Sequence, residues 1–128
     1  MRDFYLFTDK PMTIQDCFEN LKQEIAYIEM NGERDIWINN NKFRSFLWLE
    51  NERIEEYWYC TEEEFQALRK HIPIKAPYIN HFETHRSIDA KRVIKVLMQI
   101  YPELYIDIND ETEWQGTAQE YLDTEFDY

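Results

Sequence analysis

The hydrophobic positions near the start of the chain change from strand-like to helical spacing. Residues 3–8 (DFYLFT) are rich in aromatic residues and predict a strand that ends at Asp9-Lys10-Pro11. Thr13 is then a candidate N-cap, with Asp16 at the position of a capping box. Hydrophobic residues at helical spacing follow: Ile14, Cys17 or Phe18, Leu21, Ile25 and Ile28. The pattern predicts a helix that ends near Asn31-Gly32.

The next part of the chain is typical of an antiparallel meander. Three runs of strand-forming residues cover 36–39, 43–50 and 54–60. Turn-forming residues separate them, at Asn39-Asn40-Asn41 and at Asn51-Glu52. Short connections of this kind favour hairpins between neighbouring strands.

Helical spacing returns after residue 60. Thr61 and Glu64 form a capping box for a second helix, which carries Phe65, Leu68 and Ile72 and ends before Pro73. The following residues, 73–86, predict an irregular segment or at best one edge strand.

A third helix is predicted with Ser87 as its cap and Pro102 as its stop, and a last strand with residues 104–108. Thr117 and Glu120 repeat the capping-box spacing and predict a short terminal helix.

These elements together predict an α+β fold. Their order is β-α-β-β-β-α-α-β, which favours a mostly antiparallel sheet of about five strands with three main helices packed on one face. We expect a single domain over residues 1–128, with residues 123–128 as a candidate flexible acidic end.

The composition narrows the class of partner. The chain has 26 acidic and 14 basic residues, a formal net charge of −12, and 16% aromatic residues. So many aromatic side chains provide a core and argue against disorder. The negative charge disfavours direct binding to nucleic acid or to an anionic membrane, because phosphates would be repelled. It favours a cationic partner, or serves only solubility.

The charge is concentrated in two parts of the chain. Residues 99–128 contain nine acidic residues and no Lys or Arg, and residues 50–64 contain seven acidic residues against Arg53. Aromatic residues are interleaved with both clusters, as an interface for a basic protein partner requires. Two other interpretations stay open: solvated acidic faces, and tail aromatics that pack on the protein's own core. The candidate contact residues are Glu55, Glu56, Asp107, Asp110, Glu111, Glu113, Trp114 and Tyr121.

Signals for catalysis are weak. His81 and His85 have a spacing that could bind zinc on a helix, but the order of residues is not HExxH, and histidines in a loop are more often surface residues. Cys17 falls on the hydrophobic side of the first predicted helix, and Cys60 shows no CxxC pairing. With no targeting segment in view, both cysteines indicate reduced thiols in a cytoplasmic protein. We expect no enzymatic activity, no cofactor and no metal.

One segment resembles a known class of proteins. Residues 81–122 contain a capped helix running into Tyr101-Pro102-Glu103, a strand, then Asp110-Glu111, Trp114-Gln115-Gly116-Thr117 and Glu120-Tyr121-Leu122. This arrangement resembles the small bacterial immunity proteins of contact-dependent growth inhibition and related polymorphic toxin systems. The resemblance covers about a third of the chain.

The resemblance implies a cytoplasmic, non-catalytic protein that binds and neutralises the C-terminal toxin domain of a delivered effector. Many such toxins are basic nucleases, and an acidic inhibitor can occupy the groove that takes nucleic acid. It carries over no specific binding residue. Two other classes remain: a phage-type acidic mimic of nucleic acid that inhibits a host defence nuclease, and a small metal-dependent enzyme that uses His81 and His85. The oligomeric state stays open.

Overall fold

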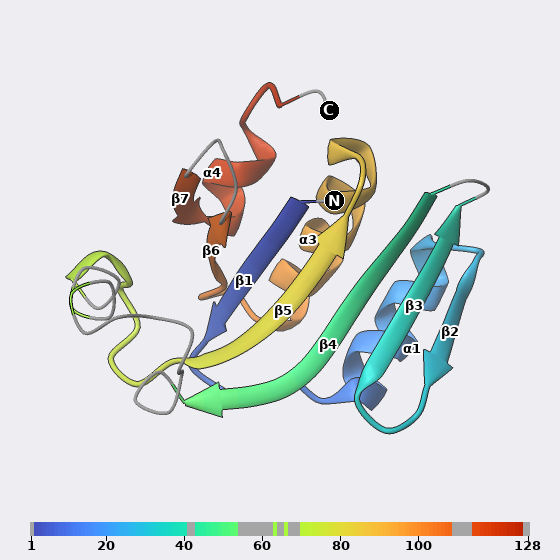
Figure 1. The fold of residues 1–128 in the computed structure, drawn as a ribbon, viewed down its shortest axis with the longest axis horizontal. Helices are drawn as coiled ribbons and strands as arrows, with labels where there is room; N and C mark the ends of the chain where they lie inside the picture. Colours follow the sequence, from blue (N-terminus) through green and yellow to red (C-terminus); the bar gives the residue numbers. More distant parts are fainter. Residues whose placement is uncertain are drawn as a thin grey trace.

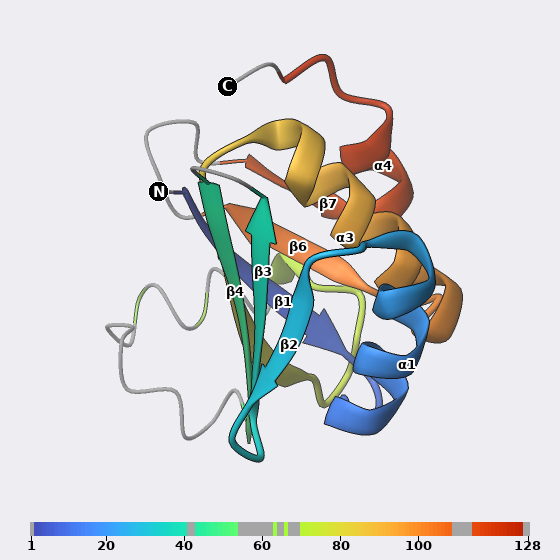
Figure 2. The same ribbon diagram turned by 90° about the vertical axis from the view of Figure 1, so that its right-hand side faces the viewer.

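The computed structural model describes residues 2–40, 43–53, 70–108 and 114–126, together with residues 63 and 66. These residues form one seven-stranded antiparallel sheet with helices on one side (Figures 1 and 2). The strands lie in the order β2-β3-β4-β5-β1-β6-β7. Their bounds are β1 Arg2–Thr8, β2 Ile28–Asn31, β3 Asp35–Asn40, β4 Phe43–Arg53, β5 Tyr78–Thr84, β6 Tyr105–Ile108 and β7 Trp114–Thr117. The helices are α1 Ile14–Glu24, α3 Ser87–Ile100 and α4 Ala118–Leu122.

Strand β1 organises the sheet, because it pairs with β5 on one side and with β6 on the other. The β1–β5 register runs without a break from Arg2 opposite Thr84 to Thr8 opposite Tyr78. Successive residues of a strand point to opposite faces. Phe4 and Leu6 therefore face the helices, while Asp3 and Tyr5 face the other side.

The main core lies between the sheet and the three helices, and a smaller buried cluster of Phe7, Ile72, Ile79 and Tyr105 lies on the opposite face. Helix α1 contributes Cys17 and Leu21, and α3 contributes Val93, Ile94 and Leu97, all fully buried. Further fully buried side chains come from the strands and from α4. They include Phe4, Leu6, Leu47, Phe82, Ile106 and Tyr121. Among the described residues, no helix is both long enough and apolar enough to cross a membrane.

Two predicted caps are confirmed, and one of them also joins two helices. The Thr13 hydroxyl accepts a hydrogen bond from the Asp16 N–H, and the Thr13 N–H donates to the Tyr101 hydroxyl over 3.0 Å. Since Tyr101 ends α3, this bond ties the beginning of α1 to the end of α3. Thr117 and Glu120 form a complete capping box for α4.

The first helix is shorter than predicted. Helix α1 ends at Glu24, because Ile25 is already extended, and residues 28–31 form the edge strand β2. Ile28 pairs with Ile38 of β3, and Gly32 provides the left-handed turn between the strands with φ 79°. Ile25 and Ile28 therefore contribute to the hydrophobic core, as their spacing suggests, but they do so from outside the helix.

The predicted turn at Asn51-Glu52 is wrong, since β4 continues to Arg53. Asn51 has a left-handed backbone with φ 49°, and the β4–β5 register shifts between Trp48 and Glu52. A turn-forming residue has produced an irregularity inside a strand instead of a reversal of the chain.

Side-chain amides satisfy the backbone groups at this irregularity. The Asn51 N–H donates to Asn80 Oδ1 over 2.8 Å, and the Asn80 amide donates to Asn51 Oδ1 over 2.9 Å. Asn51 also accepts from the Met12 N–H and donates to the Met12 carbonyl. We call Met12, Asn51 and Asn80 the asparagine network. It joins β4, β5 and the segment that leads into α1.

The structure of segment 73–86 differs most from the prediction. Residues 78–84 form β5, a central strand between β4 and β1, where an irregular segment or an edge strand was expected. The polar residues Asn80, His81 and Glu83 obscure the alternation of hydrophobic and polar positions that marks a strand, because side chains pack on both faces of β5. Ser87 is the first residue of α3 and not its cap. Arg86 holds the cap position; its side chain makes no capping hydrogen bond and donates to the Asp89 carboxylate instead.

The α+β class is confirmed, and the described residues form seven strands in place of the expected five or so. Strands β1, β3, β4 and β6 were predicted, β2 and β7 were not, and β5 was expected at best as an edge strand. The predicted strand over 54–60 and most of the predicted helix over 61–72 lie outside the described residues.

The asparagine network leads to a test of stability. Asn80→Ala removes the acceptor of the Asn51 N–H inside the protein, so we expect the free energy of unfolding to fall by about 2 kcal/mol. Asn39→Ala is the matched control, because that strand asparagine makes one exposed hydrogen bond of 3.4 Å to Glu29. It should change stability by less than about 0.5 kcal/mol. Urea unfolding of both variants measures the difference, and equal losses would contradict the role of the network.

Candidate functional site

The face of the sheet opposite the three helices carries a continuous row of rings. Trp37 of β3 packs edge-on against Phe46 of β4 at 5.8 Å between ring centroids, and Phe46 stacks on Trp48 at 5.5 Å. Trp48 stacks on His81 of β5 at 5.1 Å, and His81 stacks on Tyr5 of β1 at 5.2 Å. We call these five residues the aromatic row, and this side of the sheet the aromatic face. The row crosses four neighbouring strands.

Cross-strand pairing places carboxylates along the aromatic row and at both of its ends. On the β2–β3 side, Glu29 pairs with Trp37, and Asp35 pairs with Trp48. In the middle of the row, Glu83 of β5 pairs with Phe46 of β4. The register then brings Asp3 opposite Glu83 and Asp107 opposite Tyr5. The five carboxylates that frame the row are Glu29, Asp35, Glu83, Asp3 and Asp107.

The rings of the aromatic row are half-buried. All five lie between the buried and the exposed classes, unlike the fully buried Phe4 and Phe82 on the helix side. The same face also carries Arg44, which the register places opposite Asn39. Half-buried rings held rigidly on strands present contact area at a small cost in side-chain entropy.

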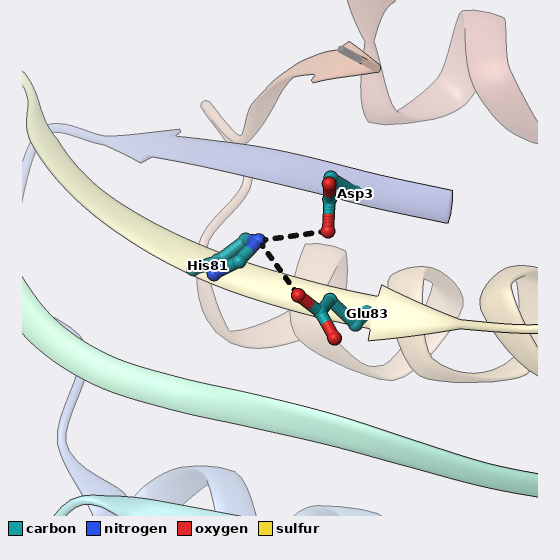
Figure 3. A group of neighbouring side chains, drawn as sticks. All are labelled: Asp3, His81 and Glu83. Atoms are coloured by element: carbon teal, nitrogen blue, oxygen red, sulfur yellow. Dashed lines mark hydrogen bonds and ion pairs between the residues drawn. The ribbon is translucent and has the colours of Figure 1, made fainter. Parts of the chain in front are cut away.

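Asp3, His81 and Glu83 form a compact cluster beside the row. His81 Nε2 lies 3.3 Å from Asp3 Oδ1 and 3.7 Å from Glu83 Oε1, and both carboxylates point toward the imidazole (Figure 3). Burial, a hydrogen bond with Asp3 and the charge of Asp3 raise the pKa of Glu83 to about 7. The sheet therefore holds two carboxyl groups closer together than their like charges favour.

Asp107 is the predicted contact residue that lies on the aromatic face. Burial raises its pKa from the ordinary value of 3.8 to about 6, although a hydrogen bond from Gln115 acts in the opposite direction. Gln115 is its cross-strand partner on β7. Asp107 is thus a carboxylate that the fold holds partly desolvated at the end of the aromatic row.

Trp114 and Tyr121 lie on the helix side, away from Asp107. Tyr121 has no exposed surface and packs edge-on against Phe4 at 5.4 Å and against Trp114 at 5.6 Å. Phe126 packs against both rings. These three rings pack on the protein's own core, so Tyr121 is corrected to a core residue. The other five predicted contact residues lie outside the described part of the chain: Glu55, Glu56, Asp110, Glu111 and Glu113.

The side chains considered for catalysis are placed differently from one another. His81 belongs to the acidic cluster, whereas the ring of His85 packs against Phe43 at 6.0 Å and does not join that cluster. Cys17 is buried, and burial raises the pKa of its thiol to about 12, which leaves almost no thiolate at neutral pH. Cys60 lies outside the described residues.

Most of the aromatic face was missed in the sequence. Its residues come from strands β1, β3, β4 and β5, far from the acidic end of the chain on which charge counting concentrates. A sequence signal for this face did exist. Phe46 and Trp48 are two residues apart, as are His81 and Glu83, and residues with this spacing in a strand lie on the same side of the sheet. Such pairs share one face once the strands are known.

Comparison of the chain with family models, with curated proteins and with solved structures found no match. The chemistry of the aromatic face is therefore the feature that points to a function.

Asp107 leads to a prediction about pH. Its raised pKa means that the folded protein binds the proton more tightly than the unfolded chain does, so the residue is most favourable below about pH 4. That advantage is lost as pH rises through about 6. Asp107→Asn should remove this dependence and raise the free energy of unfolding at pH 7. Since the side chain keeps partial exposure, we expect about 1–2 kcal/mol.

The control for this measurement is Glu103→Gln, which neutralises an exposed carboxylate and changes the net charge equally. Unfolding of both variants and of the unmodified protein is followed in denaturant at pH 4, 5, 6 and 7. If the two variants respond to pH in the same way, general charge repulsion and not desolvation of Asp107 explains the effect.

Proposed function

We propose that this protein is a non-catalytic immunity protein that binds and neutralises a cognate toxin domain with a basic surface, with a nuclease as the favoured class. The observation that carries the proposal is the aromatic row framed by five carboxylates. The resemblance of residues 81–122 to bacterial immunity proteins supports the biological setting.

The aromatic face has the two components of a strong protein interface. Half-buried Trp, Phe and Tyr rings are the side chains that contribute most to binding when a partner covers them. Carboxylates around them pair with Lys or Arg of the partner and accelerate association through long-range attraction. A standard interface buries about 800 Å² on each partner, which a face spanning several strands can provide.

The arrangement of carboxylates favours a protein partner over a role as a nucleic-acid mimic. A mimic requires negative charges spaced along an elongated surface, like successive phosphates. The carboxylates of the aromatic face instead lie around a row of rings, two at its ends and three along it. Rings at the centre with charges around them match the anatomy of a protein interface.

The test begins with the basic domain encoded by the gene immediately upstream, in the arrangement expected of a toxin and its antidote. The purified protein should form a stable complex with that domain and abolish its activity. Failure to bind any basic domain encoded beside it would refute the immunity role.

Two variants locate the interface within such a complex. Trp37→Ala and Phe46→Ala each remove a ring from the aromatic row, and we expect each to weaken binding by at least about tenfold, mainly through faster dissociation. Tyr27→Ala is the control, because this tyrosine is 66% exposed and lies outside the row. Thermal unfolding confirms that each variant is folded, and surface plasmon resonance gives the rates. Unchanged affinity in both ring variants would exclude the aromatic face.

A further inference from the structure

The cluster of Asp3, His81 and Glu83 has the composition and geometry of a metal site. It offers one imidazole nitrogen and two carboxylate oxygens, and the three ligand atoms all lie within 4.8 Å of one another (Figure 3). Metal bonds of about 2.0–2.2 Å in a tetrahedral arrangement place ligand atoms about 3.3–3.6 Å apart. The separations of 3.3 Å and 3.7 Å from His81 Nε2 are already close to these values.

The scaffold holds the three side chains in place before any ion binds. Glu83 lies opposite Asp3 in the β1–β5 register, and His81 precedes Glu83 by two residues on the same face. The imidazole is stacked between Tyr5, at an interplanar angle of 13°, and Trp48, at 28°. A ligand fixed by packing on rigid strands loses little freedom when it coordinates an ion.

The cluster is also accessible and negatively charged. The side chains of His81, Asp3 and Glu83 are 32%, 40% and 26% exposed, so an ion can enter from solvent. Two carboxylates that the sheet holds side by side repel each other, and a divalent cation between them converts that repulsion into attraction.

We propose that Asp3, His81 and Glu83 bind one divalent transition-metal ion of the Zn²⁺ class. The imidazole selects such an ion over Mg²⁺ and Ca²⁺, which favour oxygen ligands, and the carboxylates select against Cu⁺. Three protein ligands leave at least one coordination position for water or for a side chain of a bound partner. The proposal is independent of the immunity role.

The experiment uses the full chain without a polyhistidine tag, after treatment with a chelator. Titration with Zn²⁺ in a calorimeter should give one ion per chain, and Co²⁺ should give visible absorption bands from its bound form. His81→Gln and Asp3→Asn should each weaken Zn²⁺ binding by at least about tenfold. Binding of Zn²⁺ should also raise the melting temperature of the unmodified protein.

His85→Gln and Asp107→Asn are the matched controls. The first removes a histidine and the second an aspartate, and both residues lie outside the cluster. Both should bind Zn²⁺ as the unmodified protein does. Absence of saturable binding up to about 1 mM Zn²⁺ would overturn the proposal. So would full binding by both His81→Gln and Asp3→Asn, or Mg²⁺ binding as tight as that of Zn²⁺.

Asp3→Asn keeps the test decisive if His81→Gln fails to fold, because Asp3 is near the end of β1 and makes no ring contact in the aromatic row. Circular dichroism without metal shows which variants are folded. The metal titration contains no partner and the toxin-binding assay can contain a chelator. Failure of either proposal is therefore distinguishable from failure of the other.

Discussion

The unbroken pairing of β1 with β5 is the constraint on which the two faces of this protein depend. Seven consecutive residue pairs assign each side chain of both strands to one side of the sheet. Phe4 and Phe82 therefore meet in the core, at 5.7 Å between ring centroids, while Tyr5 and His81 stack on the opposite face. A slip of one residue would exchange the two sets and bury the charges of β1 and β5 beneath the helices. The core and the aromatic face are consequently two results of one register.

The asparagine network extends this constraint to β4. Between Trp48 and Glu52 the strand advances four residues while β5 advances only two, from His81 to Ile79. The ladder cannot satisfy the backbone of the additional residues, and the Asn80 side chain accepts the hydrogen bond from the Asn51 N–H. Because Trp48 still pairs with His81 before the shift, the aromatic row continues from β4 to β5. The Asn80 amide, buried on the helix side, thus holds β4 to β5 directly after the point where the ring of Trp48 meets that of His81.

The sequence predicted the parts of the fold whose signals are local. Caps such as Thr117 with Glu120, and the hydrophobic spacing of α3, indicate their elements without knowledge of the rest. Strand β5 was missed because both of its faces are occupied and one of them carries His81 and Glu83, so it shows no simple alternation of apolar and polar residues. The candidate site was missed for a related reason. Asp3 and Glu83 are eighty residues apart in the chain, and only the register of the sheet makes them neighbours. Conversely, Tyr121 looked like part of an acidic surface because charge counting ignores which side of the last helix faces the core.

The aromatic face carries charges that do not serve stability. Desolvation raises the pKa of Asp107 to about 6, and burial together with Asp3 raises that of Glu83 to about 7, so each residue is less favourable as a carboxylate when the protein is folded. An amide or a threonine at either position would avoid this cost. Carboxyl groups with such perturbed pKa values concentrate at functional sites, because a cationic ligand can reverse the sign of their contribution. A basic partner or a divalent ion would place positive charge beside these carboxylates and so favour their charged form. The same electrostatic feature therefore supports both proposals, and it explains why the surplus negative charge matters most where the sheet concentrates it beside aromatic rings.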